Sequence, residues 1–268
     1  MAVLSTFVAA DGGGYELQMG RWSRRLAPLF VDFTGIRQAD SVLDLGCGTG
    51  SLSLCLAQRP EIASVCGVDL SPAYIEHACR EISHPRVSFR IGDACDLRFP
   101  DASFDHALSM LMVQFVPHPD RAVREMRRVT RPGGTVAAAT WDARGGFVAL
   151  RMVFDTAAML DRNAGERRAL AYTRPLSRPG ELERAWCDAG LTEVVQEPLT
   201  IRMEFASFAD FWSPAEGKDG PVADYVRTLD AEARQVLQDM VRLAYLDGEV
   251  DGRRSYAATA WAVRGKVP

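Results

Sequence analysis

A glycine-rich loop directly after a predicted strand constrains the fold of this chain more than any other feature. Residues Ser41–Leu45 (SVLDL) form an apolar strand pattern, and Gly46–Gly50 (GCGTG) follows before a predicted helix over Ser51–Gln58. Glycines in such a turn let the backbone approach a ligand closely, because they lack a side chain and tolerate positive φ. The loop therefore predicts an α/β fold that binds a nucleotide.

Strand and helix patterns alternate after this loop as far as Trp141. Strands are predicted over residues 64–69, 87–91, 104–112 and 135–140, helices over 72–82 and 120–130, and a turn over 131–134. Short links between strands and helices favour a parallel sheet with helices on both faces.

Two further strands complete the predicted sheet. A helix pattern over 179–190 precedes a strand over 192–205, and another strand covers 255–264. We expect these last two strands to be antiparallel neighbours at one edge. The predicted fold class is a doubly wound, mostly parallel seven-stranded α/β sheet of Rossmann-like type, with an antiparallel edge strand and helical insertions.

Net charge and hydropathy limit the kinds of partner that we expect for this protein. The chain has 31 Lys+Arg against 35 Asp+Glu, a net charge of −4, which gives no overall field to hold a nucleic acid. The longest apolar run, Ala107–Val116, is interrupted and falls well short of the roughly 18 residues of a membrane span. The apolar start MAVLSTFVAA has no basic residue, so we expect no signal peptide and a cytoplasmic location.

Cysteine and histidine spacing gives no sign of a metal site. The six cysteines form no CxxC pair and are predicted to be reduced, and no HxxxH or HxH spacing occurs. We predict no metal.

Asp69 indicates which nucleotide the loop would bind. It ends the second predicted strand, 19 residues after Gly50, where a carboxylate can accept hydrogen bonds from the two hydroxyls of a ribose. The loop and this carboxylate together indicate adenosine. A nicotinamide-dependent enzyme and a methyltransferase both fit them.

Four motifs in order resemble the class I S-adenosylmethionine-dependent methyltransferases, close to the quinone-biosynthesis type. They cover about a hundred residues: Val42–Gly50 (VLDLGCGTG), Gly67–Ser71 (GVDLS), Gly92–Ala94 followed by Phe99–Asp105 (FPDASFD), and Arg131–Thr135 (RPGGT). The resemblance implies S-adenosyl-L-methionine as cofactor and S-adenosyl-L-homocysteine as product.

The resemblance also implies a set of cofactor-binding residues. Gly46, Cys47 and Gly48 contact the methionine part, Asp44 supports its cationic end, Asp69 binds the ribose hydroxyls, Asp93 and Ala94 contact the adenine edge, and Ser109 lies near the amino group and the sulfonium, while Leu70 and Gln114 complete the set. Gln114 stands where relatives often carry a histidine, which leaves any general base unassigned.

The segment Tyr15–Arg25 resembles the amino-terminal helix that covers the cofactor in this group. Arg21 is the candidate that clamps the methionine carboxylate, because a guanidinium matches a carboxylate in charge and geometry. Arg24 and Arg25 are the alternatives. Tyr15 and Trp22 are predicted to close the pocket, the alternative being that they pack in the core.

We predict a single methyltransferase domain over residues 1–268. Its parts are amino-terminal cap helices at 1–40, a cofactor-binding core at 41–141, helical insertions at 142–178 and 207–252, and the end of the sheet at 179–206 and 253–268. Substrate choice is assigned to the cap and to the insertion at 207–252, with Trp22, Phe208, Phe211, Trp212 and Tyr225 as candidate pocket residues. Alternatively, the four insertion aromatics pack that segment onto the sheet.

Methyl transfer from a sulfonium mainly requires alignment and exclusion of water. If the acceptor needs a base, His118 is the candidate; otherwise it caps its loop. The predicted function is transfer to a small-molecule acceptor, with nucleic acid not expected as partner and the oligomeric state open.

Three other functions stay open. They are a non-catalytic protein that binds S-adenosylmethionine or S-adenosylhomocysteine, an NAD-dependent oxidoreductase, and a protein or RNA methyltransferase. No tyrosine has a lysine four residues later, which argues against the oxidoreductase. The arginines between Arg121 and Arg131 form the solvent face of an amphipathic helix, which argues against RNA.

Overall fold

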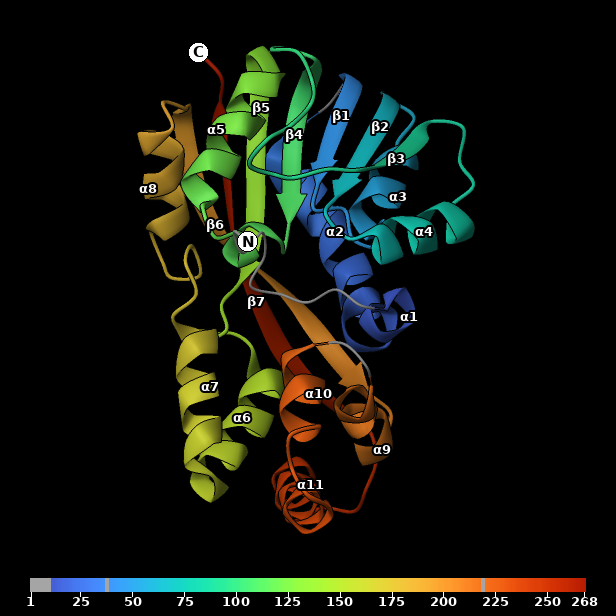
Figure 1. Ribbon diagram of the computed structural model, residues 1–268, viewed down its shortest axis with the longest axis vertical. Coiled ribbons are helices and arrows are strands. Elements are labelled where there is room, and N and C mark those ends of the chain that lie inside the picture. The colour runs from blue at the N-terminus through green and yellow to red at the C-terminus, as the bar shows by residue number, and fades with distance from the viewer. Residues whose placement is uncertain (1–10, 37–38, 218–219) are drawn as a thin grey trace.

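Seven strands form one sheet in the computed structural model, which describes residues 11–36, 39–217 and 220–268 (Figure 1). The apolar start of the chain, residues 1–10, lies outside the described residues. The strands are β1 (Ala39–Leu45), β2 (Ile62–Asp69), β3 (Val87–Ile91), β4 (Phe104–Met110), β5 (Thr130–Trp141), β6 (Thr192–Phe205) and β7 (Arg254–Lys266). Their order is β3-β2-β1-β4-β5-β7-β6.

The strand directions confirm the predicted fold class. Strands β1 to β5 pair in parallel, whereas β7 pairs antiparallel with both β5 and β6 at one edge of the sheet. A switch in strand order between β1 and β4 opens a crevice at the carboxyl ends of the strands, where ligands of such sheets bind.

Helices connect the strands and fill the two long segments between β5 and β7. They are α1 (Gly12–Tyr15), the π-helical turn η1 (Glu16–Gly20), α2 (Arg21–Thr34), α3 (Ser51–Ala57), α4 (Pro72–Glu81), the 3₁₀ turn η2 (Val113–Phe115), α5 (Pro119–Val129), α6 (Val148–Leu160), α7 (Arg162–Tyr172), α8 (Glu181–Asp188), α9 (Phe208–Trp212), the 3₁₀ turn η3 (Ser213–Glu216), α10 (Pro221–Val226) and α11 (Ala231–Leu246). Local capping agrees with the pattern: Ser71 accepts a hydrogen bond from the Tyr74 amide at the start of α4.

The predicted turn over 131–134 is wrong. β5 begins at Thr130, which pairs with Phe104, and the next paired residue is Thr135, opposite His106. The four residues 131–134 of β5 thus lie opposite the single residue Asp105 of β4, so the extra residues bulge out of the ladder. Gly133 has φ +79° in this bulge, and a side chain at Gly134 would collide with the Asp105 carbonyl oxygen. The glycines permit a bulge within a strand, where sequence pattern alone indicated a turn.

Alternating side chains divide the core into two layers. Val42 and Leu108 face a cluster that includes Leu26 of α2 and Leu52 of α3. Their chain neighbours point the other way, toward a cluster formed with α5 and α8, whose largest member is Trp186. Helices therefore cover both faces of the sheet, as the parallel pattern requires.

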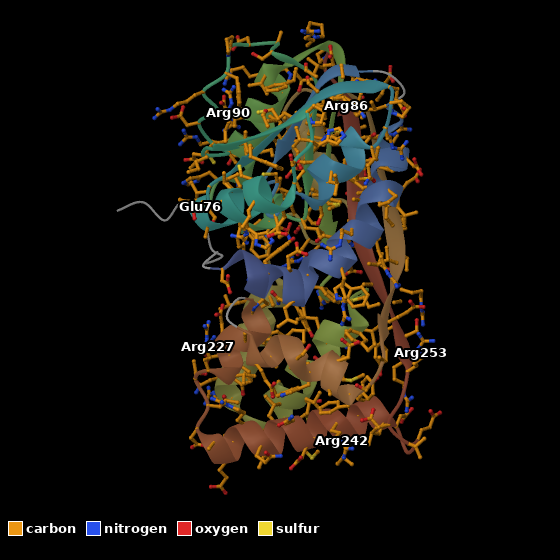
Figure 2. The ribbon with its side chains drawn as sticks, turned by 90° about the vertical axis from the view of Figure 1, so that its right-hand side faces the viewer. Glu76, Arg86, Arg90, Arg227, Arg242 and Arg253 are labelled. Carbon is orange, nitrogen blue, oxygen red and sulfur yellow. The ribbon has the colours of Figure 1, made fainter. Side chains whose placement is uncertain are left out.

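Apart from α8, which packs on the sheet, the helices of the two long segments lie beyond the carboxyl ends of β1, β4 and β5 (Figure 1). β7 continues past its last pair with β5, Trp141 with Ala260, and β6 accompanies it to the pair of Phe205 with Arg254. This two-stranded extension connects the sheet with α6, α7, α9, α10 and α11. Arg242 on α11 and Arg86 just before β3 lie toward opposite ends of the molecule (Figure 2). Among the described residues, no helix is both long and apolar enough to cross a membrane.

Candidate functional site

A cavity of about 460 Å³ lies between the carboxyl ends of the strands and the helices beyond them. Its walls come from the glycine loop, the ends of β2 and β4, the amino-terminal helices, the segment after β5 and the extension of β6. Of the residues predicted to contact the cofactor or the substrate, those that line it are Tyr15, Trp22, Gly46, Gly48, Asp69, Leu70, Asp93, Ala94 and Gln114. One cavity thus brings together residues from four separate connections of the fold.

Positive φ angles and backbone hydrogen bonds define the conformation of the glycine loop. Gly46, Gly48 and Gly50 have φ of +71°, +55° and +92°, a region that favours glycine. The amides of Gly46 and Cys47 both donate to the Val68 carbonyl oxygen, at 2.7 and 3.1 Å, which fastens the loop to β2. A side chain at Gly46 would collide with Met112 after β4. The loop therefore packs directly against the turn that follows β4.

Asp69 is fixed at the end of β2 by two backbone amides. Gly48 N donates to Oδ2 and Ser71 N donates to Oδ1, both at 2.9 Å. Burial raises the pKa of this carboxyl, and the bonds from Ser71 and Gly48 oppose that rise. A carboxylate has about four acceptor positions, so further donors can bind. This arrangement suits a diol.

Asp44 lies buried just before the loop and does not line the cavity. The Ser53 hydroxyl donates to Oδ2 at 2.6 Å, whereas Oδ1 has no hydrogen-bond partner among the described residues. Burial raises the pKa of Asp44 to about 7, and the charge of Asp69 adds to the rise. An orphaned buried carboxylate oxygen is costly unless a cationic group pairs with it, which fits the ammonium end of a methionine.

Asp93 and Ala94 line the cavity beyond β3. The amide of Cys95 donates to Asp93 Oδ1 at 2.8 Å, so the tight turn orients this carboxylate. The amide of Gly92 donates to the Asp69 carbonyl oxygen at 2.9 Å, so this turn lies next to Asp69.

The amino-terminal helices close the cavity above the glycine loop. The Tyr15 hydroxyl shares a 3.1 Å hydrogen bond with Ser23, and its ring lies 5.3 Å from that of Tyr74. Burial raises the pKa of Tyr15 to about 12. Thr49 of the glycine loop donates to Glu16 Oε1 at 2.5 Å, inside the π-helical turn. Cap and loop are therefore joined by a direct polar contact.

Comparisons with known proteins agree with this geometry. Residues 43–138 match the family model described as a methyltransferase domain, which spans β1 to β5. Over residues 43–138 the chain is thus similar to methyltransferase domains.

Curated relatives are similar over this domain. The 2-methyl-6-phytyl-1,4-hydroquinone methyltransferase of Synechocystis is 41% identical over 109 residues, which are 39% of this chain and 33% of the relative. The demethylmenaquinone methyltransferase of Symbiobacterium thermophilum is 34% identical over 122 residues, 44% and 47% of the two chains. The chain thus spans a third to a half of the length of these relatives.

Solved structures extend the likeness to the whole fold. Phosphoethanolamine N-methyltransferase 2 of Haemonchus contortus, solved with S-adenosyl-L-methionine, has a TM-score of 0.61 at 17% identity, covering 96% of this chain and 56% of that one. At this identity the likeness concerns the fold alone.

Arg21 does not line the cavity of the methyltransferase domain. Its Nη1 pairs with both carboxylate oxygens of Asp210, at 2.9 and 3.2 Å, and its Cζ lies 4.2 Å above the Trp22 ring. Asp210 stands 189 positions later in the chain, so no local pattern could indicate this partner. The expectation that Arg21 clamps the methionine carboxylate does not agree with this pairing. The two alternatives do not line the cavity either. Arg24 pairs with Glu16, and Arg25 pairs with Glu204.

Of three other residues predicted to bind the cofactor, one lines the cavity and two are buried behind its wall. Gln114 lines the cavity; its Nε2 donates to the Leu111 carbonyl oxygen at 3.0 Å, and its Oε1 has no partner among the described residues. Leu111 has φ +67°, which turns the chain sharply after β4. Ser109 and Cys47 are buried and lie behind the wall, where burial raises the pKa of the Cys47 thiol. Neither residue lines the cavity in which their contacts with the cofactor were predicted.

His118 is not part of the site. It is exposed at the start of α5, outside the cavity wall, and its carbonyl oxygen accepts from the Cys95 thiol at 3.5 Å. The alternative was that His118 caps its loop; it occupies the N-cap position of α5, but its side chain makes no capping hydrogen bond. Among the described residues, no group of His, Cys, Asp and Glu could hold a metal ion.

The four insertion aromatics do not line the cavity. Phe208, Phe211 and Trp212 are buried and pack with one another and with Tyr245, while the Tyr225 hydroxyl donates to Asp161 at 3.3 Å. The expectation that they line the substrate pocket is therefore wrong, because these helices turn their aromatic side chains toward each other.

The sequence-based prediction also missed much of the actual wall. The apolar side chains beyond the cofactor residues are Phe115, Trp141, Phe147, Leu150, Met203, Phe205 and Val222. In β6, apolar residues alternate with charged ones over Ile201–Phe205, and this sequence signal could have indicated Met203 and Phe205. Arg174 and Ser177, between α7 and α8, were missed as well, since no motif surrounds them.

Proposed function

We propose that this protein transfers a methyl group from S-adenosylmethionine to a small-molecule acceptor. The observation that carries the proposal is one cavity with two kinds of wall. On one side lie the glycine loop, Asp69 and Asp93, which come from three successive strand ends. On the other side lie aromatic and aliphatic side chains from β6 and the long segments. This division suits a nucleotide-containing donor beside an apolar acceptor.

The described residues fit the proposed donor. Asp69 binds the ribose hydroxyls, Asp93 and Ala94 contact the adenine edge, and the Asp44 carboxylate balances the ammonium end behind the glycine loop. When bound, S-adenosylmethionine supplies a methyl carbon on a sulfonium, and the electron pair of the broken C–S bond stays on sulfur. The remaining work of the protein is to align the acceptor and exclude water, which the cap with Tyr15 and Trp22 performs.

The first experiment is isothermal titration of the full chain with S-adenosylmethionine, S-adenosylhomocysteine and NAD. We expect both sulfur nucleotides to bind and NAD not to bind. Asp69→Asn should weaken the binding of both sulfur nucleotides by about tenfold or more, because hydrogen bonds to a charged group contribute about 1.5–3 kcal/mol. Asp239→Asn, the same change on the exposed surface of α11, should leave the affinities unchanged. Binding of NAD alone would overturn the proposal.

Turnover separates an enzyme from a non-catalytic binding protein. The acceptor panel begins with hydroquinones, because two relatives are named for a hydroquinone and for demethylmenaquinone. Methylated product from any small acceptor supports the enzyme. Cofactor binding with no product across the panel favours a non-catalytic protein, and activity only on protein or RNA excludes the small-molecule acceptor. Recovery of the native protein from the cytoplasmic fraction would support the cytoplasmic location that we propose with this function.

A further inference from the structure

Two buried polar side chains of the cavity wall each carry an atom that has no hydrogen-bond partner within the described part of the chain. They are Gln114, which is 5% exposed, and Trp141, which is 8% exposed. The unpaired atoms are the side-chain oxygen Oε1 of Gln114 and the indole nitrogen Nε1 of Trp141. Most buried polar groups in proteins are paired, because an unpaired one destabilises the fold. Two such atoms in one cavity wall therefore indicate a ligand that pairs with them.

The surroundings of Gln114 decide which end of its amide is unpaired. Gln114 Nε2 donates to the Leu111 carbonyl oxygen at 3.0 Å. A carbonyl oxygen can only accept, so the NH₂ group of the amide must face Leu111. The amide of Leu111 in turn donates to the Ala139 carbonyl oxygen at 2.7 Å, which fastens this turn to β5. Gln114 thus supplies a hydrogen-bond acceptor just beyond the end of β4.

Trp141 supplies the complementary atom from the neighbouring strand. It ends β5 two residues after Ala139, so the two side chains lie on one face of the strand, and both belong to the buried cluster that contains Leu111. The Trp141 ring lies 5.1 Å from that of Phe147, which also lines the cavity. An indole nitrogen can only donate. The ends of β4 and β5 therefore supply one acceptor and one donor.

One donor together with one acceptor favours a hydroxyl group as the ligand. A hydroxyl oxygen can accept from Trp141 Nε1 while the hydroxyl hydrogen is donated to Gln114 Oε1. An ether, a ketone or a carboxylate could pair only with Trp141, and an ammonium group only with Gln114. Both protein groups are neutral, which suits a neutral ligand group.

We propose that Gln114 and Trp141 bind a hydroxyl group of the acceptor, which is an alcohol or a phenol with an apolar body. The inference rests on the proposed function for the donor that shares the cavity. Met112, in the same turn as Gln114, packs against Gly46 of the glycine loop, so the hydroxyl lies at the end of the acceptor that is nearer the donor. Phe147 lines the cavity beside Trp141 and suits the apolar body.

The test compares ligands of nearly equal size that differ in the hydroxyl group. The pairs are 4-ethylphenol with 1-ethyl-4-fluorobenzene, and hexan-1-ol with 1-fluorohexane. Each compound is titrated into the full chain with and without saturating S-adenosylhomocysteine, and the affinity for S-adenosylhomocysteine is measured separately.

The variants remove one hydrogen-bonding atom each. Trp141→Phe removes the N–H donor and keeps an aromatic ring, and Gln114→Met removes the amide and keeps the length of the side chain. Trp261 of β7 also has an Nε1 without a partner among the described residues, but it does not line the cavity, so Trp261→Phe is the matched control. Gln238→Met on α11, outside the cavity wall, is the control for Gln114→Met.

We expect the wild type and both controls to bind the hydroxyl compound about tenfold or more tightly than the fluoro compound in at least one pair. Trp141→Phe and Gln114→Met should each lower this preference by about threefold or more, and the double variant should lose it. The affinities for the fluoro compounds and for S-adenosylhomocysteine should change by less than about twofold, which also shows that the variants are folded. Either single variant suffices for the test if the other does not fold.

Three results overturn this inference. The first is a wild type without a preference for the hydroxyl compound in either pair, which would mean that water pairs with the two atoms. The second is a preference that survives in the double variant. The third is a Gln114→Met variant that keeps the preference but binds S-adenosylhomocysteine about tenfold more weakly, because Gln114 then belongs to the donor site. Failure of the wild type to bind S-adenosylhomocysteine overturns the proposed function instead, and the titrations without this nucleotide distinguish the two failures.

Discussion

Folding removes the Asp44 carboxyl from water and leaves one of its oxygens without a partner among the described residues. Burial, assisted by the charge of Asp69, raises its pKa from 3.8 to about 7. The folded state therefore binds a proton more tightly than the unfolded state, and the free energy of unfolding falls as the pH rises from about 4 to 7. Asp44→Asn removes this titration. We expect the stability of the wild type relative to the variant to fall by about 4 kcal/mol over that range.

Urea denaturation of both ligand-free proteins between pH 4 and pH 8 measures this difference directly. Other carboxyl groups titrate in both proteins, so their contributions cancel. A difference between the two proteins that does not change with pH would show that Asp44 stays ionised in the fold.

Single residues were predictable where their role depends on local sequence. Gly46 and Gly48 follow the end of β1, Asp69 ends β2, and all three residues line the cavity. Arg21 was not predictable, because its choice of Asp210 depends on how α9 is placed against α2. Arg174 was missed for the same reason, because Phe115 and most other residues of the cavity that it lines are far from it in sequence.

The ion pair of Arg21 with Asp210 joins two elements, α2 of the cap and α9 beyond the sheet. Both side chains are about one-third exposed, and Asp210 also accepts the Ala206 amide at 2.9 Å. We expect Asp210→Asn to lower the free energy of unfolding by about 1 kcal/mol, since partly exposed pairs contribute little. The affinity for S-adenosylhomocysteine should change by less than about twofold.

Thermal unfolding and isothermal titration measure the two quantities. The control is Asp224→Asn. This change removes an exposed ion pair between Asp224 in α10 and Arg227, which directly follows α10. A loss of S-adenosylhomocysteine affinity of about tenfold in Asp210→Asn alone would mean that Arg21 acts in cofactor binding through this pair.

The presence of helices and strands was easier to predict than which of their sides would face the cavity. The predicted helical insertion at 207–252 does contain helices, namely α9, α10 and α11. A helix with aromatic residues on several sides, however, does not indicate which side meets the cavity, so Phe208 and Trp212 were misassigned. The bulge in β5 was missed because Gly133 and Gly134 fit a turn as well as an irregular strand.

At the scale of the whole molecule, the alternating pattern between Ser41 and Trp141 sufficed to predict the parallel part of the sheet. The long segments after it carry no such repeat. Their position beyond the carboxyl ends depends on the extension of β6 and β7 past the end of β5, a consequence of strand length and register. That extension is what creates the apolar wall with Met203 and Phe205.

A ligand enclosed between two layers should stabilise both against local opening. In hydrogen–deuterium exchange with mass spectrometry, we expect S-adenosylhomocysteine at about 100 times its Kd to slow exchange in the cap over Gly12–Thr34 and in the glycine loop, by up to about a hundredfold. The π-helical turn Glu16–Gly20 should respond most, since it contacts the loop through Thr49. α11 contributes no residue to the cavity wall, so its exchange should not change. Protection limited to the glycine loop would mean that the cap does not close over the donor.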